Sequence, residues 1–246
     1  MEYFVNSVDV AVVGAGHAGI EAALAAARMG CQTALFTISN DAVGNMPCNP
    51  SIGGTGKGQL VFEIDALGGE MGKAADKVML QDRMLNLSKG PAVHSKRIQA
   101  DRRLYQDIMK KTIEHTENLS LIQAEICEIR KLDEGDYRFA VVDRLSAIWH
   151  AKTVIICSGT FLDSKIIIGD VIYPSGPDGL HPAAFLTKSI LELGVKMLRF
   201  KTGTPPRIDA RTVDYSVLER QDGEEKLTPY SAETEMADLE ARPKLP

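Results

Sequence analysis

The sequence has 246 residues, of which 44% are hydrophobic and 25% charged, and its formal net charge is −5. This composition is typical of a globular chain with its own core, and the negative charge argues against nucleic-acid binding by the whole surface. No run of eighteen apolar residues predicts a membrane span, the first eight residues do not resemble a signal peptide, and the four cysteines form no C-x-x-C pair. We therefore expect a soluble cytoplasmic protein with no membrane association, metal site or disulfide framework.

The first 37 residues predict a βαβ unit. An apolar run at residues 9–14 predicts a buried parallel strand, residues 20–29 a helix that ends at Gly30, and residues 33–36 a second buried strand. Between the first strand and the helix lies a match to G-x-G-x-x-G, formed by Gly14, Ala15, Gly16, His17, Ala18 and Gly19.

This glycine pattern predicts a dinucleotide site. In a strand-to-helix turn the first glycine makes the tight turn, the second lets the backbone approach a pyrophosphate, and the third allows close helix packing. The helix N-terminus then faces the phosphates. The acid expected about twenty residues further on is absent, and Asn40 and Asp41 are the nearest polar alternatives for contacting a ribose.

Residues 38–58 predict a long functional loop, because they hold seven glycines or prolines and no apolar periodicity. Cys48 lies in this loop, where it is either an ordinary loop cysteine or an accessible nucleophile. Dithiol redox chemistry is not expected, because the position five residues later is Gly53. The run Gly53–Gly58 resembles a P-loop, but Ser51 replaces its first glycine and Gly58 its hydroxyl residue, so we reject ATP binding there.

Two helices are expected after this loop. The first contains Leu60, Val61, Ile64 and Leu67, and the second spans about residues 99–117 with Leu104, Ile108 and Thr112 on one side. Residues 83–111 hold eight bases against two acids, which indicates either phosphate binding or a solvated helix face. The candidate RNA contacts in this stretch are Lys89, Lys96, Arg97, Arg102 and Arg103.

The second half predicts more strands and then a change in composition. Three short β-rich runs lie between residues 119 and 142, and a buried strand ends at Cys157 and runs into Ser158-Gly159-Thr160. Residues 219–240 hold eight acids against two bases, which predicts a solvated excursion or a disordered tail. We therefore expect a domain over residues 1–204 with a β-insertion at about 119–150, and residues 205–246 as a linker or the start of an inserted second domain.

These features predict an α/β fold, a Rossmann-like, doubly wound and mostly parallel sheet with a small β-meander. The β-rich insertion and the second glycine-containing strand end favour FAD over a plain nicotinamide site.

Several longer strings resemble the MnmG (GidA) family. They are Cys48-Asn49-Pro50-Ser51-Ile52-Gly53-Gly54, Lys57-Gly58, Glu63-Ile64-Asp65-Ala66-Leu67-Gly68-Gly69, Ser88-Lys89-Gly90-Pro91-Ala92-Val93, Gln99-Ala100-Asp101-Arg102 and Lys201-Thr202-Gly203-Thr204-Pro205-Pro206-Arg207. The resemblance implies an FAD enzyme that works with the GTPase MnmE and adds an aminomethyl or carboxymethylaminomethyl group to C5 of the tRNA wobble uridine. It also implies methylenetetrahydrofolate and NADH as co-substrates, a homodimer, and a heterotetramer with MnmE.

The resemblance further assigns residues to roles. It implies that Gly14–Gly19 hold the FAD pyrophosphate, that Ile126 contacts the cofactor, and that Cys48 is catalytic. Two departures weaken it: His94 replaces a common arginine, and Ala183 replaces a serine that often contacts FAD. The family's second catalytic cysteine follows a Leu-Pro pair, and the printed sequence ends at Leu245-Pro246. We therefore expect a truncated FAD-binding domain that is inactive by itself. The alternatives are a non-catalytic FAD- or RNA-binding module and a relative of the folate- and FAD-dependent tRNA uracil methyltransferases.

Overall fold

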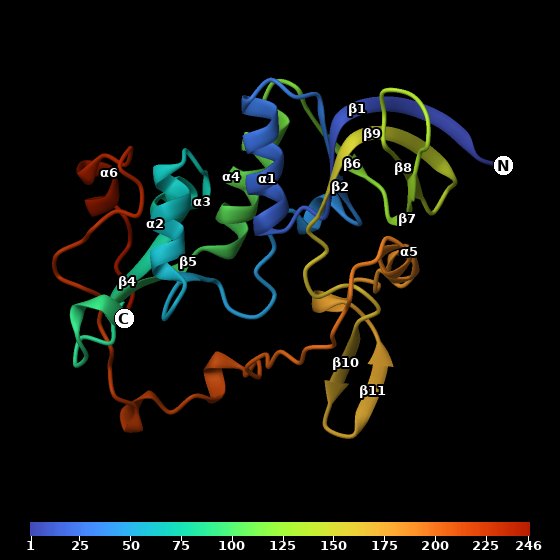
Figure 1. Ribbon diagram of the computed structural model, residues 1–246. Coiled ribbons are helices and arrows are strands. Elements are labelled where there is room, and N and C mark those ends of the chain that lie inside the picture. The colour runs from blue at the N-terminus through green and yellow to red at the C-terminus, as the bar shows by residue number, and fades with distance from the viewer. The chain divides into compact units, whose positions relative to one another are not determined.

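The computed structural model describes residues 1–246 and divides the chain into two compact units (Figure 1). Unit 1 comprises Met1–Asn45 and Met109–Phe200, and unit 2 comprises Met46–Ile108 and Lys201–Pro246. Along the sequence, the second unit therefore interrupts the first. The composition boundary near residue 205 lies close to the return into unit 2 at Lys201, whereas no composition change marks its start at Met46.

Unit 1 is built on a six-stranded sheet of order β6-β2-β1-β9-β8-β7. Its strands are β1 (Tyr3–Val13), β2 (Thr33–Thr37), β6 (Leu119–Gln123), β7 (Ile126–Lys131), β8 (Phe139–Asp143) and β9 (Ala147–Ile156). β6, β2, β1 and β9 are parallel, and β8 and β7 continue the sheet as an antiparallel meander. The α/β prediction with a mostly parallel sheet is confirmed. In the region of the predicted β-insertion, β6 joins the parallel strands, and β7 and β8 extend the same sheet.

Helices pack on both faces of this sheet. Alternate residues of β1 and β2, including Val13 and Phe36, share a core with Leu186 of helix α5 (Leu186–Glu192). The residues between them, such as Val12 and Leu35, point to the other face, where helix α1 (His17–Arg28) contacts both strands. Unit 1 also contains the antiparallel hairpin of β10 (Lys165–Ile168) and β11 (Val171–Pro174).

Unit 2 contains a three-stranded antiparallel sheet of order β3-β5-β4. Its strands are β3 (Ser51–Gly53), β4 (Met79–Leu85) and β5 (Ser95–Ala100), and its helices are α2 (Gly58–Ala66), α3 (Met71–Lys77) and α6 (Met236–Glu240). Helix α4 (Arg102–Glu114) contains the boundary between the units, and short 3-10 turns occur at Asn40–Ala42, Pro91–Val93, Pro177–Gly179, Ala210–Thr212 and Tyr215–Val217.

Both helices predicted after the loop form, but their buried faces differ from the prediction. α4 begins three residues later than expected, because Ser95–Ala100 form β5 and the Asp101 carboxylate caps the new helix start. Its buried side chains are Tyr105, Met109 and Ile113, one position beyond the predicted stripe. In α2, Val61 is buried while Leu60 is exposed, and Leu67, which directly follows the helix, is exposed as well.

The acidic segment at residues 219–240 is not a disordered tail. Leu227, Tyr230, Ser231 and Leu239 are all buried. The Asp76 carboxylate on α3 accepts hydrogen bonds from the amides of Tyr230 (2.9 Å) and Ser231 (3.0 Å) and from the Thr234 hydroxyl (2.7 Å). Burial raises the pKa of Asp76, and these donors partly offset the cost of burying its charge. Of the two alternatives, the disordered tail is wrong because an acceptor distant in sequence anchors the segment, whereas most of its other residues are exposed, as in a solvated excursion.

None of the helices has the length and apolar character that a membrane crossing requires. No group of three or more His, Cys, Asp and Glu side chains is arranged to hold a metal ion.

Candidate functional site

The glycine turn between β1 and α1 has the geometry that the sequence predicts. Gly14 has a φ of +107°, and a Cβ added to it would lie 2.3 Å from the carbonyl oxygen of Cys157. A Cβ on Gly19 would lie 1.7 Å from the Gly14 carbonyl oxygen, so the helix approaches the turn too closely for any side chain. Gly16 differs, because a Cβ there would meet nothing within 4 Å. The space beside Gly16 is therefore unfilled, and this is the glycine at which a pyrophosphate would approach.

The N-terminus of α1 is suited to an anion. Its cap residue is Gly16, no side chain caps it, and the first turn contains no acid. The positive end of the helix dipole is therefore not neutralised by a local carboxylate. Burial lowers the pKa of the half-buried His17, so this imidazole is neutral at pH 7 and adds no positive charge.

Two further residues of the predicted cofactor site have distinct environments. Asn40 follows β2, and its Oδ1 atom is buried without a hydrogen-bond donor, so an acceptor is available near the strand end where a ribose hydroxyl binds in this fold. Ile126 begins β7, and its side chain is 4% exposed within the hydrophobic core. The structure therefore leaves little surface of Ile126 available to a cofactor.

Cys48 belongs to unit 2 and lies in the irregular segment before β3. The side chain is half-buried, and its Sγ lies 3.5 Å from Oγ1 of Thr204. The guanidinium of Arg207 donates to the carbonyl oxygens of Cys48 (2.5 Å) and Pro47 (3.1 Å). Residues 48 and 204–207 are thus brought together, although the spacing of the two motifs along the chain gave no sign of this contact.

The other three cysteines are free, and two lie in environments that suppress reactivity. Burial, with a smaller contribution from the charge of Glu125, raises the pKa of Cys127 to about 11. Burial also raises the pKa of Cys157. A thiol with a raised pKa carries little thiolate at neutral pH, and thiolate is the reactive form.

We expect Cys127 to react with iodoacetamide at pH 8 about 100-fold more slowly than a cysteine in a short peptide, because its pKa is about 11 rather than the ordinary value near 9. The rate should rise about tenfold for each pH unit until the thiol titrates. Peptide mass spectrometry after timed alkylation measures this rate. Equal rates for Cys127 and the short peptide at pH 8 would show that the thiol is not shielded.

The candidate RNA contacts differ in their availability. Lys89 and Arg103 are exposed, while Arg97 is half-buried and its guanidinium donates to the Ser51 hydroxyl at 3.3 Å. Arg102 is half-buried and already has an interaction partner. The side chain of Lys96 is 1% exposed and forms an ion pair with Asp82 at 2.5 Å. Lys96 therefore cannot contact a phosphate in this structure, and the prediction for it is wrong.

The strand register brings together two basic residues that lie 14 positions apart in the sequence. Arg83 on β4 lies directly opposite Arg97 on β5. Like charges at opposed positions are unfavourable unless another group compensates them. The side-chain partners of these arginines, Gln221 and Ser51, are both neutral. Since neither arginine has a carboxylate partner, the pair can accept an anion.

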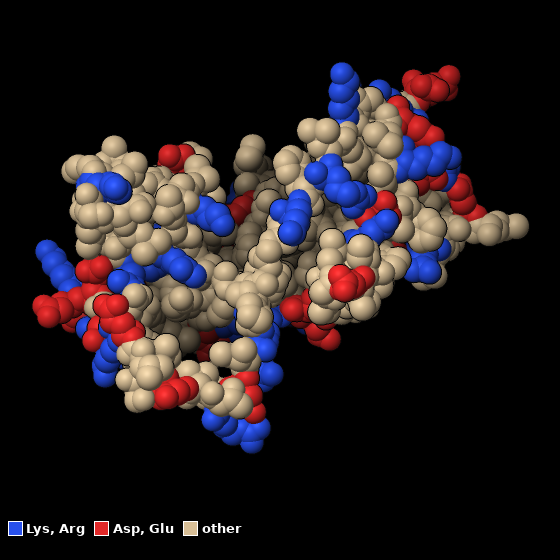
Figure 2. Space-filling view, turned by 90° about the horizontal axis from the view of Figure 1, so that it is seen from below, with Lys and Arg blue, Asp and Glu red and all other residues tan.

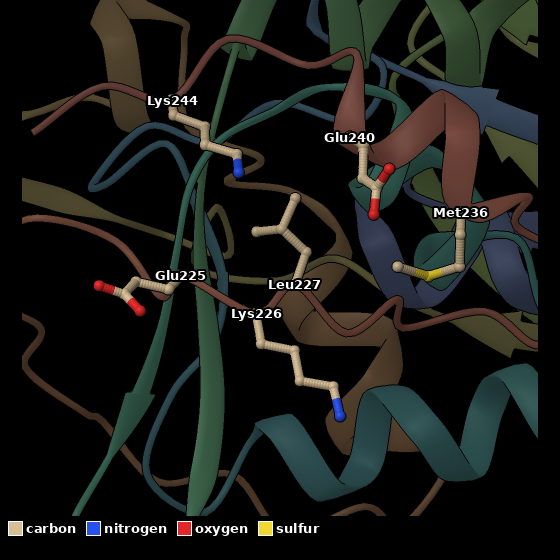
Figure 3. A pocket seen from close by; sticks show the side chains of 6 residues that line it. All are labelled: Glu225, Lys226, Leu227, Met236, Glu240 and Lys244. Atoms are coloured by element: carbon tan, nitrogen blue, oxygen red, sulfur yellow. The ribbon is translucent and has the colours of Figure 1, made fainter.

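The charged side chains on the face shown in Figure 2 are mixed in sign. Figure 2 shows lysine and arginine side chains interspersed with acidic ones over the visible face, in keeping with the net charge of −5. A pocket of about 560 Å³ in unit 2 is lined by Glu225, Lys226, Leu227, Met236, Glu240 and Lys244 (Figure 3). Its lining includes none of the predicted site residues.

Comparison with known proteins places these features in a family. The family described as "Glucose inhibited division protein A" matches residues 9–244. The chain belongs to this family. The tRNA uridine 5-carboxymethylaminomethyl modification enzyme MnmG of Caldicellulosiruptor saccharolyticus is 53% identical over 243 residues, which are 99% of this chain and 38% of that protein. The enzyme of the same name from Clostridium kluyveri is 52% identical over 97% of this chain and 38% of that protein.

The structural likeness agrees with this membership in the GidA family. Aquifex aeolicus GidA has a TM-score of 0.87 and 46% identity, over 94% of this chain and 38% of that chain. The GidA-related protein of Thermus thermophilus, at 21% identity and a TM-score of 0.53, shares the fold, over 77% of this chain and 70% of that chain. The present chain thus spans somewhat more than a third of the length of the curated relatives given above.

Proposed function

We propose that this chain is the N-terminal part of a cytoplasmic, FAD-dependent enzyme that modifies C5 of the wobble uridine in tRNA. The observation that carries the proposal is 53% identity over nearly the whole chain to an enzyme named for tRNA uridine 5-carboxymethylaminomethyl modification. The activity is proposed for a whole protein that contains this chain, since the chain spans 38% of that relative.

In this proposal unit 1 holds the FAD pyrophosphate. The backbone from Gly14 to Gly19 lines the approach at Gly16, and the start of α1 supplies N–H donors with a favourable dipole. Asn40 would accept a hydrogen bond from a ribose hydroxyl. The contact of Ile126 with the cofactor, which the family resemblance implies, would need local movement because the residue is buried. Bound FAD would supply redox chemistry, with NADH as the reductant. The role of this chain is to bind and orient the dinucleotide end.

FAD titration tests the cofactor proposal. Because the glycine turn recognises phosphates, FAD and ADP-ribose should compete for one site while riboflavin should not. The matched sample is a chimera that joins residues 1–246 to the remaining part of the Caldicellulosiruptor saccharolyticus relative, which supplies the portion that this chain does not span. Flavin fluorescence quenching reports binding. A folded chimera that binds no FAD would overturn the proposal.

Cys48 would act as the nucleophile. A thiolate that adds to C6 of uracil forms a carbon–sulfur bond and shifts the C5–C6 double-bond electrons to C5. C5 then attacks the methylene carbon of methylenetetrahydrofolate, the proposed donor, and one of the two carbon–nitrogen bonds of that methylene breaks, its electron pair and a proton going to the folate nitrogen. Loss of the C5 proton re-forms the C5–C6 double bond and expels the sulfur as thiolate, and an amine would then have to replace the remaining folate nitrogen on the methylene carbon. The half-buried position of Cys48 and its contact with Thr204 support a held rather than a freely mobile thiol.

The partners proposed for the whole protein are tRNA, the GTPase MnmE and a second copy of the same protein. In this chain the RNA contacts that we retain are Lys89, Arg97 and Arg103, with Arg102 less available because of its existing partner. Arg83 joins the set because it lies opposite Arg97.

The variant Arg97→Gln should weaken binding of a tRNA anticodon stem-loop and reduce the slope of log affinity against log salt by about 0.7 to 0.9, the change for one lost phosphate contact. Fluorescence anisotropy between 50 and 200 mM salt, about the range over which such contacts are screened, measures the slope. Lys188→Gln is the control, since Lys188 is exposed in unit 1 and pairs with Glu192. If both variants gave the wild-type slope, Arg97 would not contact the RNA backbone.

A further inference from the structure

The segment around Cys48 has little regular structure, so its position depends on contacts made by other parts of the chain. Residues 44–50 lie in turns, bends and irregular backbone, and β3 begins only at Ser51. The carbonyl oxygens of Pro47 and Cys48 accept hydrogen bonds from one Nη2 atom, that of Arg207. One guanidinium therefore holds two consecutive peptide carbonyls of the segment that carries the thiol.

The contact of Thr204 with Cys48 is of a different kind, because it reaches the sulfur itself. Oγ1 lies 3.5 Å from Sγ, within hydrogen-bonding range for sulfur. A hydroxyl can both accept and donate. It can accept from the neutral thiol and, after rotation, donate to a thiolate, so one group can serve both forms of the sulfur.

The two prolines between Thr204 and Arg207 constrain the distance between these residues. Pro205 and Pro206 separate Thr204 from Arg207, and residues 201–209 form no helix or strand. A proline ring fixes φ near −65° and restricts the preceding residue to extended conformations. The two-proline spacer thus limits the ways in which the Thr204 hydroxyl and the Arg207 guanidinium can move relative to each other.

We infer that Arg207 is a positioning residue for the Cys48 segment and that Thr204 is the hydrogen-bond partner of the reacting sulfur. This inference rests on the proposed nucleophilic role of Cys48. It assigns separate tasks to two members of one short motif: Arg207 fixes the backbone, and Thr204 orients the thiol and holds it when it is charged.

Thiol reactivity tests the role of Thr204 in the 246-residue chain. Thr204→Val keeps the shape but removes the hydroxyl, and it should slow alkylation of Cys48 by about tenfold, the scale of one hydrogen bond to a charged group. Thr204→Ser keeps the hydroxyl and should stay within about twofold of the wild type. Thr202→Val, two residues away, is the matched control and should change nothing. Equal slowing by valine and serine, or slowing by neither, would overturn this part.

Backbone exchange tests the role of Arg207. Arg207→Gln should speed amide hydrogen exchange in the peptide that covers residues 46–51, and Arg207→Lys should restore part of the protection because it keeps one charged donor. Arg211→Gln is the control, since Arg211 is exposed and pairs with Asp209 in the same stretch. Unchanged exchange at residues 46–51 in Arg207→Gln would overturn the positioning role.

Activity of the chimera separates this inference from the proposed function. If Cys48→Ala is inactive while Thr204→Val and Arg207→Gln have wild-type kcat, the positioning inference fails and the nucleophile stands. If Cys48→Ala keeps its activity while Thr204 still controls alkylation, the nucleophile proposal fails and the contact between the two residues stands.

Discussion

Gly19→Ala should disrupt the βαβ unit of unit 1. The new Cβ would lie 1.7 Å from the carbonyl oxygen of Gly14 and 3.3 Å from Cβ of Cys157. The nearest obstacle is backbone, so no side-chain rotation relieves the clash, and α1 must move away from β1. We expect a loss of at least about 3 kcal/mol in the free energy of unfolding, together with loss of FAD binding.

A natural fluorescent probe, Trp149, reports the unfolding of Gly19→Ala. Trp149 is the single tryptophan, lies on β9, and packs against Phe36 of β2 with ring centroids 5.0 Å apart. Its fluorescence during urea denaturation therefore reports unit 1. Gly16→Ala is the control for fold, because its Cβ meets nothing within 4 Å. It should unfold like the wild type but bind FAD at least about tenfold more weakly, since the methyl group occupies the phosphate approach. A wild-type transition for Gly19→Ala would refute the packing argument.

Asp82→Asn should destabilise unit 2 by about 3 to 5 kcal/mol, the usual cost of leaving a buried charge without its partner. The Lys96 ammonium lies 2.5 Å from the Asp82 carboxylate, and the two side chains are 1% and 4% exposed. The remaining direct contacts of Lys96, the Thr228 carbonyl oxygen and the ring of Tyr230 at 5.2 Å, carry no full negative charge, and the Asp76 carboxylate acts on the ammonium without a direct ion pair. Hydrogen exchange of the peptides that cover β4 and β5 measures the loss, because the tryptophan lies in unit 1.

Two further variants separate charge from packing. The double variant Asp82→Leu with Lys96→Met removes both charges and keeps apolar volume, so it should be more stable than Asp82→Asn alone. Lys188→Met removes an exposed lysine that lies 3.7 Å from Glu192, and it should change stability by less than about 0.5 kcal/mol. If Asp82→Asn lowered the free energy of unfolding as little as Lys188→Met, the Lys96 ammonium would have to be in contact with solvent.

The parts of the fold that local patterns specify could be predicted from the sequence. The apolar run before Gly14, the glycine turn and the strand Thr33–Phe36 each follow from neighbouring residues, and all are present. Gly30 ends α1 with a φ of +87°, as a residue past a helix end should. The turn between β7 and β8 also has a local cause, because it contains Gly135 with a φ of +91°.

The errors concern features that depend on distant partners. Lys96 looks like a surface base until the register of β4 and β5 and the fold of unit 2 bury it beside Asp82. Likewise, the acidic segment is too polar to predict order, yet Asp76 supplies the acceptor that fixes Tyr230. Composition and periodicity describe a segment alone, whereas these burials depend on distant residues, such as Asp76, which lies 154 positions from Tyr230.

The contact of Cys48 with Thr204 also depends on residues that are distant in sequence. The sequence identified both motifs through family resemblance, but the spacing of 156 residues gave no reason to join them. Only the path of the chain back into unit 2 at Lys201 brings them together.

The most direct test of the account is mass spectrometry of nucleosides from tRNA treated with the chimera, MnmE, FAD, NADH, methylenetetrahydrofolate and glycine or ammonia. We predict that C5-modified uridine appears with wild-type residues 1–246 and is absent with Cys48→Ala, although both proteins carry equal FAD. Unmodified tRNA from an FAD-loaded wild-type chimera, or modified tRNA from Cys48→Ala, would contradict the account.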